Sequence, residues 1–508
     1  MTWGLCPTVA HALAGEAHEN GRDPRCEVGP ILAALSNAVV SPGGEGSRSG
    51  AGENVRVLFT SAPEPGAVVS AADAWLPLAL VHLAGAVRAA GHECEVVDAL
   101  SLGMGVEDVE RAVRDSGPDV VCISAVTPGF PAALELCRRV RAAGRTTVIG
   151  GVHASFMYPE FLPAGVVDFA VVGEGEETLP ELLRCLAGGG DPARVAGLAF
   201  ALGGRVIRTA PRPRLTSLDP LPKAWDLVSS GGYRWSGRPG SRMGAIVTSR
   251  GCPRRCASCC HAAQYDGTWR MRSVDSVAYE LTLLRRELAT ELVVFYDPAP
   301  TADARRFAEL TERLVELDLG LEIVLWSTVS DVLRDAPVLR QWRDAGVIHV
   351  GICRDPSEDR LEGAAAERAR ADGRRAVRAL HDAGITCETS FWLGFPDETP
   401  ATVEETLGRA FSWGPELAFF PFLTPLPYTP AWRTWGSHVI TRDYRRFNQG
   451  EPVVKPRAMA LEQLVEAAEG CARRYRAERT GQASPGDVRR AGPWLVHPAA
   501  APRGDSGS

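Results

Sequence analysis

Ser249-Arg-Gly-Cys-Pro-Arg-Arg-Cys-Ala-Ser-Cys259 follows directly from a short apolar segment, Ala245–Ser249, that predicts a strand. The stretch places three cysteines, Cys252, Cys256 and Cys259, at the spacing C-x3-C-x2-C on one loop. Three thiolates on such a loop can bind three irons of a 4Fe–4S cluster, so that the fourth iron is left without a protein ligand. The spacing therefore predicts an iron–sulfur site with one open coordination position.

The other cysteines give a different picture. Nine of the 13 stand singly, most of them in apolar segments, where cysteine behaves as a small buried hydrophobe. Cys260 adjoins the three-cysteine motif, and no role is assigned to it. A zinc knuckle that adds Cys260 and His261 is the alternative, although zinc sites more often use paired C-x2-C units.

The cysteine loop opens an alternation of strands and helices that we expect to fill residues 241–432. Further strands are predicted at Leu292–Tyr296, Glu322–Trp326, His349–Cys353, Thr386–Leu393 and Leu417–Phe422. Helices are predicted between them at Asp275–Leu288, Ala302–Leu317, Ala336–Ala345, Glu367–Ala383 and Thr402–Ser412. Six strands are fewer than the eight of a closed barrel, so we expect a partial (β/α)6 barrel with its site at the carboxyl ends of the strands.

A second α/β alternation precedes the first, over residues 54–190. Strands are predicted at Val55–Thr60, Glu93–Val97, Val120–Ser124, Thr146–Ile149 and Val167–Val172. Helices are predicted at Leu76–Ala90, Val106–Ser116, Pro131–Ala143 and Thr178–Leu186. This pattern is typical of an α/β, doubly wound parallel sheet. No G-x-G-x-x-G follows its first strand, which argues against a dinucleotide fold.

The remaining segments carry weaker patterns. Residues 1–53, with a flexible linker composition at 41–50, are expected to be a disordered extension. Residues 191–240 are expected to be a linker, with a small hairpin near Leu198–Ile207. Residues 433–480 are expected to be a mainly helical C-terminal region, and residues 481–508 a disordered tail.

Composition excludes several classes of protein. The 508 residues include 55 basic and 62 acidic side chains, a net charge of -7, so electrostatics give no reason to expect a nucleic-acid partner. No run of 18 uncharged apolar residues is present, so no membrane span is expected. Residues 1–20 lack the basic start of a signal peptide, and we therefore expect a cytoplasmic protein.

With these residues in view, the chain resembles the radical SAM superfamily, whose signature is C-x3-C-x2-C after the first barrel strand. The resemblance implies that Cys252, Cys256 and Cys259 bind the 4Fe–4S cluster and that S-adenosylmethionine (SAM) chelates the open iron. Electron transfer from a donor such as ferredoxin or flavodoxin would then yield a 5′-deoxyadenosyl radical. Ser258 departs from the family, which usually has an aromatic residue at that position.

A second match lies at Leu393-Gly-Phe-Pro-Asp-Glu-Thr399, which resembles the family's G-x-P-x-E-T turn. The resemblance implies that Gly394, Pro396 and Glu398 lie against SAM. The alternative is an ordinary strand-to-helix turn in which Thr399 is the N-cap.

Two acidic positions complete the expected SAM site. Phe295-Tyr-Asp297 resembles the acidic end of the second barrel strand, which implies a cofactor contact for Asp297. The segment His349–Asp355 stands where many members carry G-x-E-S; the usual glutamate is missing and Asp355 is the nearest acid.

The first α/β domain resembles the cobalamin-binding domain that precedes many radical SAM domains. Three strands of its sheet end in Ser124-Ala-Val-Thr127, Gly150-Gly-Val-His153 and Gly173-Glu-Gly-Glu176. Ligands of open parallel sheets bind beyond such strand ends, and glycine lets backbone approach closely. The resemblance implies cobalamin contacts for Ser124, Thr127, Gly150, Gly151, His153, Gly173, Glu174 and Gly175.

The lower axial ligand of the cobalt is a separate question. The D-x-H-x-x-G motif that supplies an axial histidine is absent, and His82, His92 and His153 stand outside any such context. A base-off, His-off cobalamin is therefore implied. For His153, an ordinary loop role is an equal alternative.

One branch of the family is most similar, over about residues 54–475: the branch with the anaerobic magnesium-protoporphyrin monomethyl ester cyclase and cobalamin-dependent C-methylases. The strings that carry this similarity are 150–158, 173–177, 332–335, 345–350, 424–430 and 443–448, with Pro452 and Pro456. They indicate the branch and leave the substrate open.

The two modules together predict C-methylation of an unactivated carbon of a small-molecule, specialised-metabolite substrate, with methylcobalamin as the methyl source. Two alternatives stay open: an oxidative cyclase or hydroxylase acting on a ring substrate, and a non-catalytic cobalamin-binding protein with a structural metal site. No general base is chosen. Tyr265, Asp266 and Tyr428 follow motifs near the expected cavity but favour loop or packing roles, and Trp269 and Arg270 are expected to pack.

Overall fold

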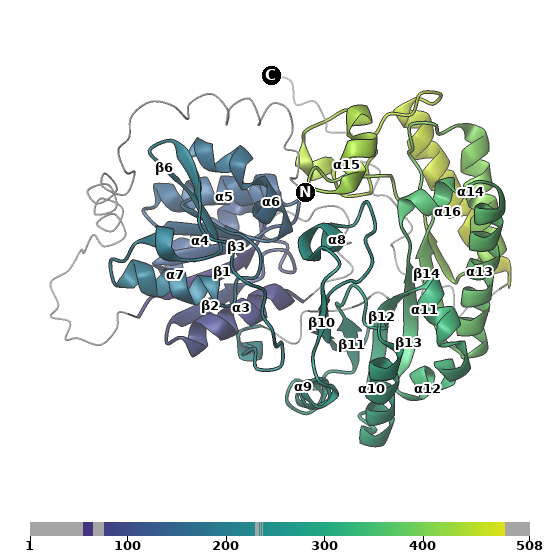
Figure 1. Ribbon diagram of the computed structural model, residues 1–508, viewed down its shortest axis with the longest axis horizontal. Coiled ribbons are helices and arrows are strands. Elements are labelled where there is room, and N and C mark those ends of the chain that lie inside the picture. The colour runs from purple at the N-terminus through teal and green to yellow at the C-terminus, as the bar shows by residue number, and fades with distance from the viewer. Residues whose placement is uncertain (1–53, 64–75, 229–232, 234, 236, 483–508) are drawn as a thin grey trace.

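The computed structural model describes residues 54–63, 76–228, 233, 235 and 237–482. The predicted extension and nearly all of the predicted tail lie outside these residues. The chain forms two α/β units side by side, an N-terminal unit in purple and blue and a C-terminal unit in teal, green and yellow (Figure 1). The helix α8 (Cys260–Tyr265) lies between them.

The N-terminal unit contains one seven-stranded sheet with the order β2-β1-β3-β4-β5-β6-β7. Its strands are β1 (Arg56–Ser61), β2 (Glu93–Val97), β3 (Val120–Ser124), β4 (Thr146–Gly150), β5 (Phe169–Val171), β6 (Leu198–Leu202) and β7 (Arg205–Arg208). The first five are parallel, as predicted, and their order reverses at β1 and β3, where open sheets bind ligands. The predicted hairpin forms β6 and β7, which extend the sheet with antiparallel pairing.

Helices cover both faces of this sheet. One apolar core packs α3 (Leu78–Ala89) and α7 (Thr178–Ala187) on one face, and a second packs α4 (Val106–Ser116), α5 (Phe130–Ala142) and α6 (Val152–Phe161) on the other. The sequence did not predict α6. This helix contains Pro159 and has buried residues on several sides, so it lacks the amphipathic stripe that marks a surface helix.

The C-terminal unit is built on a six-stranded parallel sheet with the order β15-β14-β13-β12-β11-β8, which confirms the predicted partial barrel. Its strands are β8 (Met243–Ile246), β11 (Leu292–Phe295), β12 (Glu322–Thr328), β13 (Val347–Cys353), β14 (Thr386–Ser390) and β15 (Leu417–Phe419). The main helices around it are α9 (Val274–Glu287), α10 (Ala304–Leu317), α13 (Gly363–Asp382), α14 (Pro400–Trp413) and α16 (Leu461–Gln482).

The helix predicted at Ala336–Ala345 begins as a short 3-10 turn at Ala336–Val338 and continues as α12 (Leu339–Asp344). The helix before it, α11 (Val329–Arg334), was not predicted. Pro337 lies in the 3-10 turn, where its ring restricts the preceding residue and ends α11. Among the described residues, no helix is both long and apolar enough to cross a membrane.

The segment between the two units is packed. Trp225, Tyr233 and Trp235 form one apolar core with Val81 of α3 and with residues of β8, β11 and β12. Because this core includes side chains from both units, the two units share buried apolar surface, and the strand ends of both sheets are brought to one region.

Candidate active site

The cysteine loop is closed by a two-stranded hairpin. Its strands, β9 (Ser249–Gly251) and β10 (Trp269–Met271), pair antiparallel with Gly251 opposite Trp269. Gly251 has φ +89°, and a Cβ there would lie 2.0 Å from the Thr268 carbonyl oxygen. Only glycine fits this backbone, which turns the chain into the loop at Cys252.

The three predicted cluster ligands line one cavity of about 930 Å³ at the carboxyl ends of the barrel strands. We call this the barrel cavity. Cys252 is buried, and Cys256 and Cys259 are partly buried. Burial raises the pKa of Cys256 to about 11. No group of three metal-binding side chains in the described ranges converges on a single ion; a four-iron cluster is wider than an ion and separates its ligands.

Cys260 acts on its neighbour. Its thiol donates a hydrogen bond to the sulfur of Cys259, which lowers the pKa of Cys259, while the pKa of Cys260 itself is raised. Cys259 is thus the sulfur of the loop that is most readily deprotonated. Because the thiolate is the form of cysteine that binds iron, this contact favours metal binding at Cys259.

Ser258 and Asp355, the two residues that depart from the family motifs, contact each other. Asp355, at the end of β13, accepts a hydrogen bond from Ser258 Oγ at 3.2 Å and a longer one from Ser258 N at 3.4 Å. The serine in the cysteine loop and the aspartate in place of the usual glutamate thus form one pair. The pair connects the loop to the fourth barrel strand.

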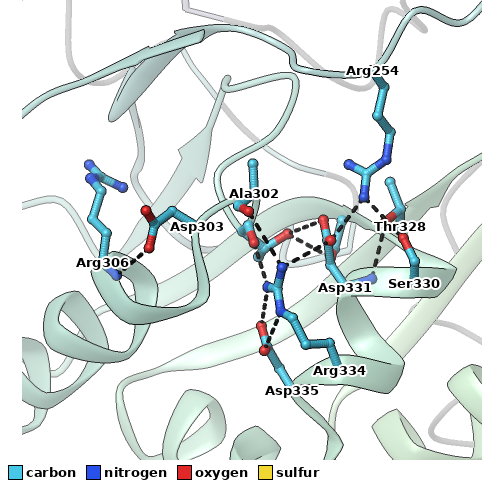
Figure 2. Close-up of polar contacts among 11 residues, drawn as sticks. Arg254, Ala302, Asp303, Arg306, Thr328, Ser330, Asp331, Arg334 and Asp335 are labelled. Atoms are coloured by element: carbon cyan, nitrogen blue, oxygen red, sulfur yellow. Dashed lines mark hydrogen bonds and ion pairs between the residues drawn. The ribbon is translucent and has the colours of Figure 1, made fainter.

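Arg254 connects the loop to the third barrel strand. Its guanidinium donates to Asp331 Oδ1 at 2.8 Å and to Ser330 Oγ at 3.0 Å, both at the start of α11 (Figure 2). Arg334 pairs with the same Asp331 and with Asp335. The cysteine loop is therefore attached to a buried acidic group that already has a second arginine partner.

Asp297 lines the barrel cavity, but its carboxylate already has three donors. It accepts hydrogen bonds of 2.6 Å from Thr248 N, Thr248 Oγ1 and Ser249 Oγ. Burial raises the pKa of Asp297. Its visible role is to position the chain between β8 and β9, and its predicted contact with SAM stays a prediction.

The turn after β14 has the geometry of the simpler alternative. Thr399 is the N-cap of α14, and Glu398, fully buried, accepts hydrogen bonds from Gly394 N and Phe395 N. Gly394 has φ +81°, which favours glycine. Neither Gly394, Pro396 nor Glu398 lines the barrel cavity, so their predicted approach to SAM is not visible here.

A second cavity, of about 310 Å³, opens at the carboxyl edge of the N-terminal sheet. We call this the sheet cavity. Six residues predicted to contact cobalamin line it: Ser124, Gly150, Gly151, Gly173, Glu174 and Gly175. A Cβ at Gly151 would lie 2.4 Å from the Ala125 carbonyl oxygen, so this wall requires glycine. The fold thus brings together residues from three strand ends that the sequence predicted to contact one ligand.

Thr127 and His153 lie outside that cavity and contact each other. His153 Nδ1 is 3.1 Å from Thr127 Oγ1, and Tyr428 OH is 2.9 Å from the same oxygen. Tyr428 also stacks on Phe156, with ring centroids 5.0 Å apart. Burial lowers the pKa of His153 to about 4, so the ring is neutral. This group joins the N-terminal unit to the segment after the barrel.

Glu174 joins the two units at another point. Arg270 of β10 donates to both of its oxygens, at 2.6 and 3.0 Å, and Arg250 of β9 pairs with it at 3.3 Å and also with Glu176. Burial alone would raise the pKa of Glu174, but Arg270, Arg250 and the Leu215 amide lower it. We call Arg250, Arg270, Glu174 and Glu176 the interdomain ion pairs.

The comparisons with known proteins agree with both modules. A B12 binding domain model matches residues 65–183, and a radical SAM superfamily model matches residues 246–410. The anaerobic magnesium-protoporphyrin IX monomethyl ester cyclase of Rubrivivax gelatinosus is 31% identical over 435 residues, covering 83% of this chain and 77% of the relative. The chain belongs to the cobalamin-binding radical SAM family.

Two further matches extend over most of the chain. An uncharacterized methyltransferase of Pyrococcus horikoshii is 28% identical over 397 residues, covering 76% of this chain and 85% of the relative. The solved structure of the radical SAM methyltransferase TsrM from Kitasatospora setae, with cobalamin and a 4Fe–4S cluster bound, has a TM-score of 0.62 at 18% identity. It covers 86% of this chain and 90% of that one. The fold is shared with that enzyme.

As a cobalamin-binding radical SAM enzyme, the protein uses cobalamin, SAM and a 4Fe–4S cluster. The donor sets fit these groups, since three sulfurs face the barrel cavity and glycine-walled strand ends face the sheet cavity. His261, Tyr296 and Pro298 line both cavities, so one thin wall separates them.

The sequence analysis missed several residues of this family member's site. His82 and Arg250 line the sheet cavity, and Arg254 connects the cysteine loop to Asp331 of α11. One signal could have indicated Arg250. Arg250 and Arg270 stand on either side of the cysteine motif, and two strands that flank a loop can pair. Nothing local marked His82.

Proposed function

We propose that the protein is a C-methyltransferase that acts on an unactivated carbon of a small molecule, in a specialised biosynthetic pathway. The proposal deepens what the family membership establishes, namely a radical SAM enzyme with cobalamin and a small-molecule substrate. The observation that carries it is the shared wall of His261, Tyr296 and Pro298. A substrate in the barrel cavity shares that cavity with the three cysteines and lies across this wall from the sheet cavity.

Each cavity has its own task in this proposal. When bound, the cofactors supply a hydrogen-abstracting radical and a transferable methyl group. Cys252, Cys256 and Cys259 hold the cluster, and Asp297, Asp355, Gly394, Pro396 and Glu398 are proposed to bound the SAM site. Ser124, Thr127, Gly150, Gly151, His153, Gly173, Glu174 and Gly175 are proposed to bound the cobalamin site.

The barrel cavity has room for more than one ligand. Its volume of about 930 Å³ is near the upper end of ordinary ligand sites. Its walls include Trp326, Trp392 and Trp413, which exclude water and offer flat apolar surface. Exclusion of water protects a reactive carbon until the methyl group arrives.

The reaction needs an electron donor, for which we propose ferredoxin or flavodoxin in a reducing compartment. The test needs no knowledge of the substrate. Reconstituted, reduced holoenzyme is given SAM labelled in its methyl group. A methyltransferase should form S-adenosylhomocysteine and retain label in the corrinoid fraction, and the absence of both would overturn the proposal.

A second candidate is an oxidative cyclase, which the 31% identity with the cyclase of Rubrivivax gelatinosus favours. It predicts 5′-deoxyadenosine release without transfer of the labelled methyl group. The same assay therefore separates the two, because each candidate leaves the label in a different pool.

A further inference from the structure

His82 is a buried histidine of α3 with no role in the proposed reaction. Its side chain is 5% exposed and lines the sheet cavity. Its Nδ1 lies 3.1 Å from Nη2 of Arg250. A guanidinium can only donate, so His82 Nδ1 must be the acceptor of this hydrogen bond. The ring is then neutral and carries its proton on Nε2.

The charge state agrees with this tautomer. Burial, followed by the positive charges of Arg250, Lys223 and Arg272, holds the pKa of His82 well below 6.5. His82 thus stays neutral at physiological pH, and the hydrogen on Nε2 is fixed by the partner of the other nitrogen.

That hydrogen has no acceptor among the described residues. His82 Nε2 is buried and makes no hydrogen bond. Leaving a buried donor unpaired is unfavourable, because the donor has lost its hydrogen bonds to water. Around it, the strands of the sheet contribute Phe59, Cys122, Val148 and Val171 to the cavity wall, all of them apolar. His82 therefore adds an oriented, unpaired donor to a cavity whose strand wall is apolar.

The nucleotide tail of cobalamin matches this arrangement. It ends in a flat dimethylbenzimidazole, and the ring nitrogen of this base is a hydrogen-bond acceptor whenever it does not bind the cobalt. The absence of the axial-histidine motif implies a base-off form, in which that nitrogen is free. We propose that His82 Nε2–H donates a hydrogen bond to the ring nitrogen of the nucleotide base in the sheet cavity.

Arg250 links His82 to the hairpin that precedes the cysteine loop. It fixes the tautomer of His82 while it pairs with Glu174 and Glu176. It also stands two residues before Cys252. The arginine that orients the base-binding donor is thus part of the hairpin that closes the cysteine loop.

The proposal rests on the cobalamin cofactor and is independent of whether methyl transfer or cyclisation follows. Its test measures binding to the full-length protein by the visible absorbance of the corrin. Three ligands are compared: cobalamin; p-cresolyl cobamide, whose phenolic base has no ring nitrogen; and cobinamide, which has no nucleotide. The variants are His82→Phe, which removes the donor, and His82→Gln, whose amide can replace Nε2–H.

His82→Phe should weaken cobalamin binding about 5–30-fold, the equivalent of about 1–2 kcal/mol for one hydrogen bond. Binding of p-cresolyl cobamide and cobinamide should stay unchanged, which also shows that the variant is folded. His82→Gln should bind cobalamin within about threefold of the wild type.

Three results would overturn the proposal. Unchanged cobalamin binding by His82→Phe would show that the donor is not used. An equal loss for cobinamide would place the effect outside the nucleotide. An equal loss for p-cresolyl cobamide would exclude the ring nitrogen as acceptor. None of these depends on product formation, so failure here is distinct from failure of the proposed methyl transfer.

Discussion

The sulfur atoms of Cys259 and Cys260 are adjacent in sequence but differ in what they can bind. Cys259 accepts the hydrogen bond and has the lowered pKa, while Cys260 donates and has the raised pKa. A cluster ligand must be a thiolate, so these pKa shifts support the proposed role of Cys259 as a ligand, with Cys260 as a supporting donor. The spacing of the motif gives the same assignment independently.

Replacement of the two cysteines separates these roles. Cys259→Ser should lower the iron and acid-labile sulfide content after anaerobic reconstitution to less than about one third of the wild-type content, because three ligands hold the cluster. Cys260→Ser should retain most of the iron, since a serine hydroxyl can still donate to Cys259. Equal iron loss in both variants would favour a four-ligand site that includes Cys260.

At the scale of single residues, the sequence reveals groups that are close in sequence but not contacts between distant residues. The three cluster cysteines are recognisable because they are close in sequence. The Ser258–Asp355 contact joins residues 97 apart, and the His82–Arg250 contact joins residues 168 apart. Each looks ordinary in its own segment. Their meaning comes only from the fold, which brings a helix of the first unit beside a hairpin of the second.

At the level of elements, the β9–β10 hairpin determines how the cysteine loop is presented. Gly251 lies in the left-handed region and has no room for a Cβ against Thr268. Such positions cost an ordinary residue about 1–3 kcal/mol from the backbone alone, before any clash. The hairpin therefore depends on this glycine.

Gly251→Ala should lower the urea midpoint of unfolding and reduce iron incorporation, because the loop can no longer close. Gly408→Ala is the matched control: this glycine lies in the middle of α14, and a Cβ there meets nothing within 4 Å. The control should gain about 0.5–1 kcal/mol of stability. If Gly251→Ala were as stable as the wild type, the hairpin would not constrain the loop.

Elements with clear periodicity were predicted close to their observed bounds, and those without it were not. The strand Val120–Ser124 and the helix Val106–Ser116 have the bounds expected, because a continuous apolar run marks the strand and Gly117 ends the helix. The helix α6 was missed because it is buried on several sides and contains Pro159. The β9–β10 pair was missed because its strands are three residues each and pair only through the intervening loop.

At the level of the whole molecule, the interdomain ion pairs connect the cobalamin module to the radical SAM barrel. The side chains of Arg270 and Glu174 are 13% and 10% exposed. Removing Arg270 takes away the arginine that donates to both oxygens of Glu174 and leaves this buried carboxylate with the longer contact to Arg250, at 3.3 Å. Exposed pairs contribute far less, typically below about 1 kcal/mol.

Arg270→Gln should therefore reduce the free energy of unfolding by about 1.5–3 kcal/mol, the cost of losing hydrogen bonds to a charged group, as measured by urea denaturation. Arg88→Gln is the control, since Arg88 pairs with Asp226 on the surface, at 42% and 64% exposure, and should change stability by less than about 1 kcal/mol. Equal effects of the two substitutions would contradict a special role for the buried pairs.

The arrangement of the two units could be predicted only in outline. The order of the two modules and both sheet types follow from alternating strands and helices. Residues 191–240 were expected to be a linker because proline, glycine and arginine are frequent there. Instead, Trp225, Tyr233 and Trp235 fill a core between the units. Composition does not reveal that three scattered aromatic residues meet the same apolar surface.

The contact between Thr127 and Tyr428 joins residues 301 apart. A ribosome adds about 5–20 residues per second, so the chain between Arg208, where the first sheet ends, and Tyr428 takes roughly 10–45 s to make. During that interval every strand of the first sheet has been made, but Tyr428 has not. The contact between the two units at Thr127 can therefore form only after the whole barrel has been translated.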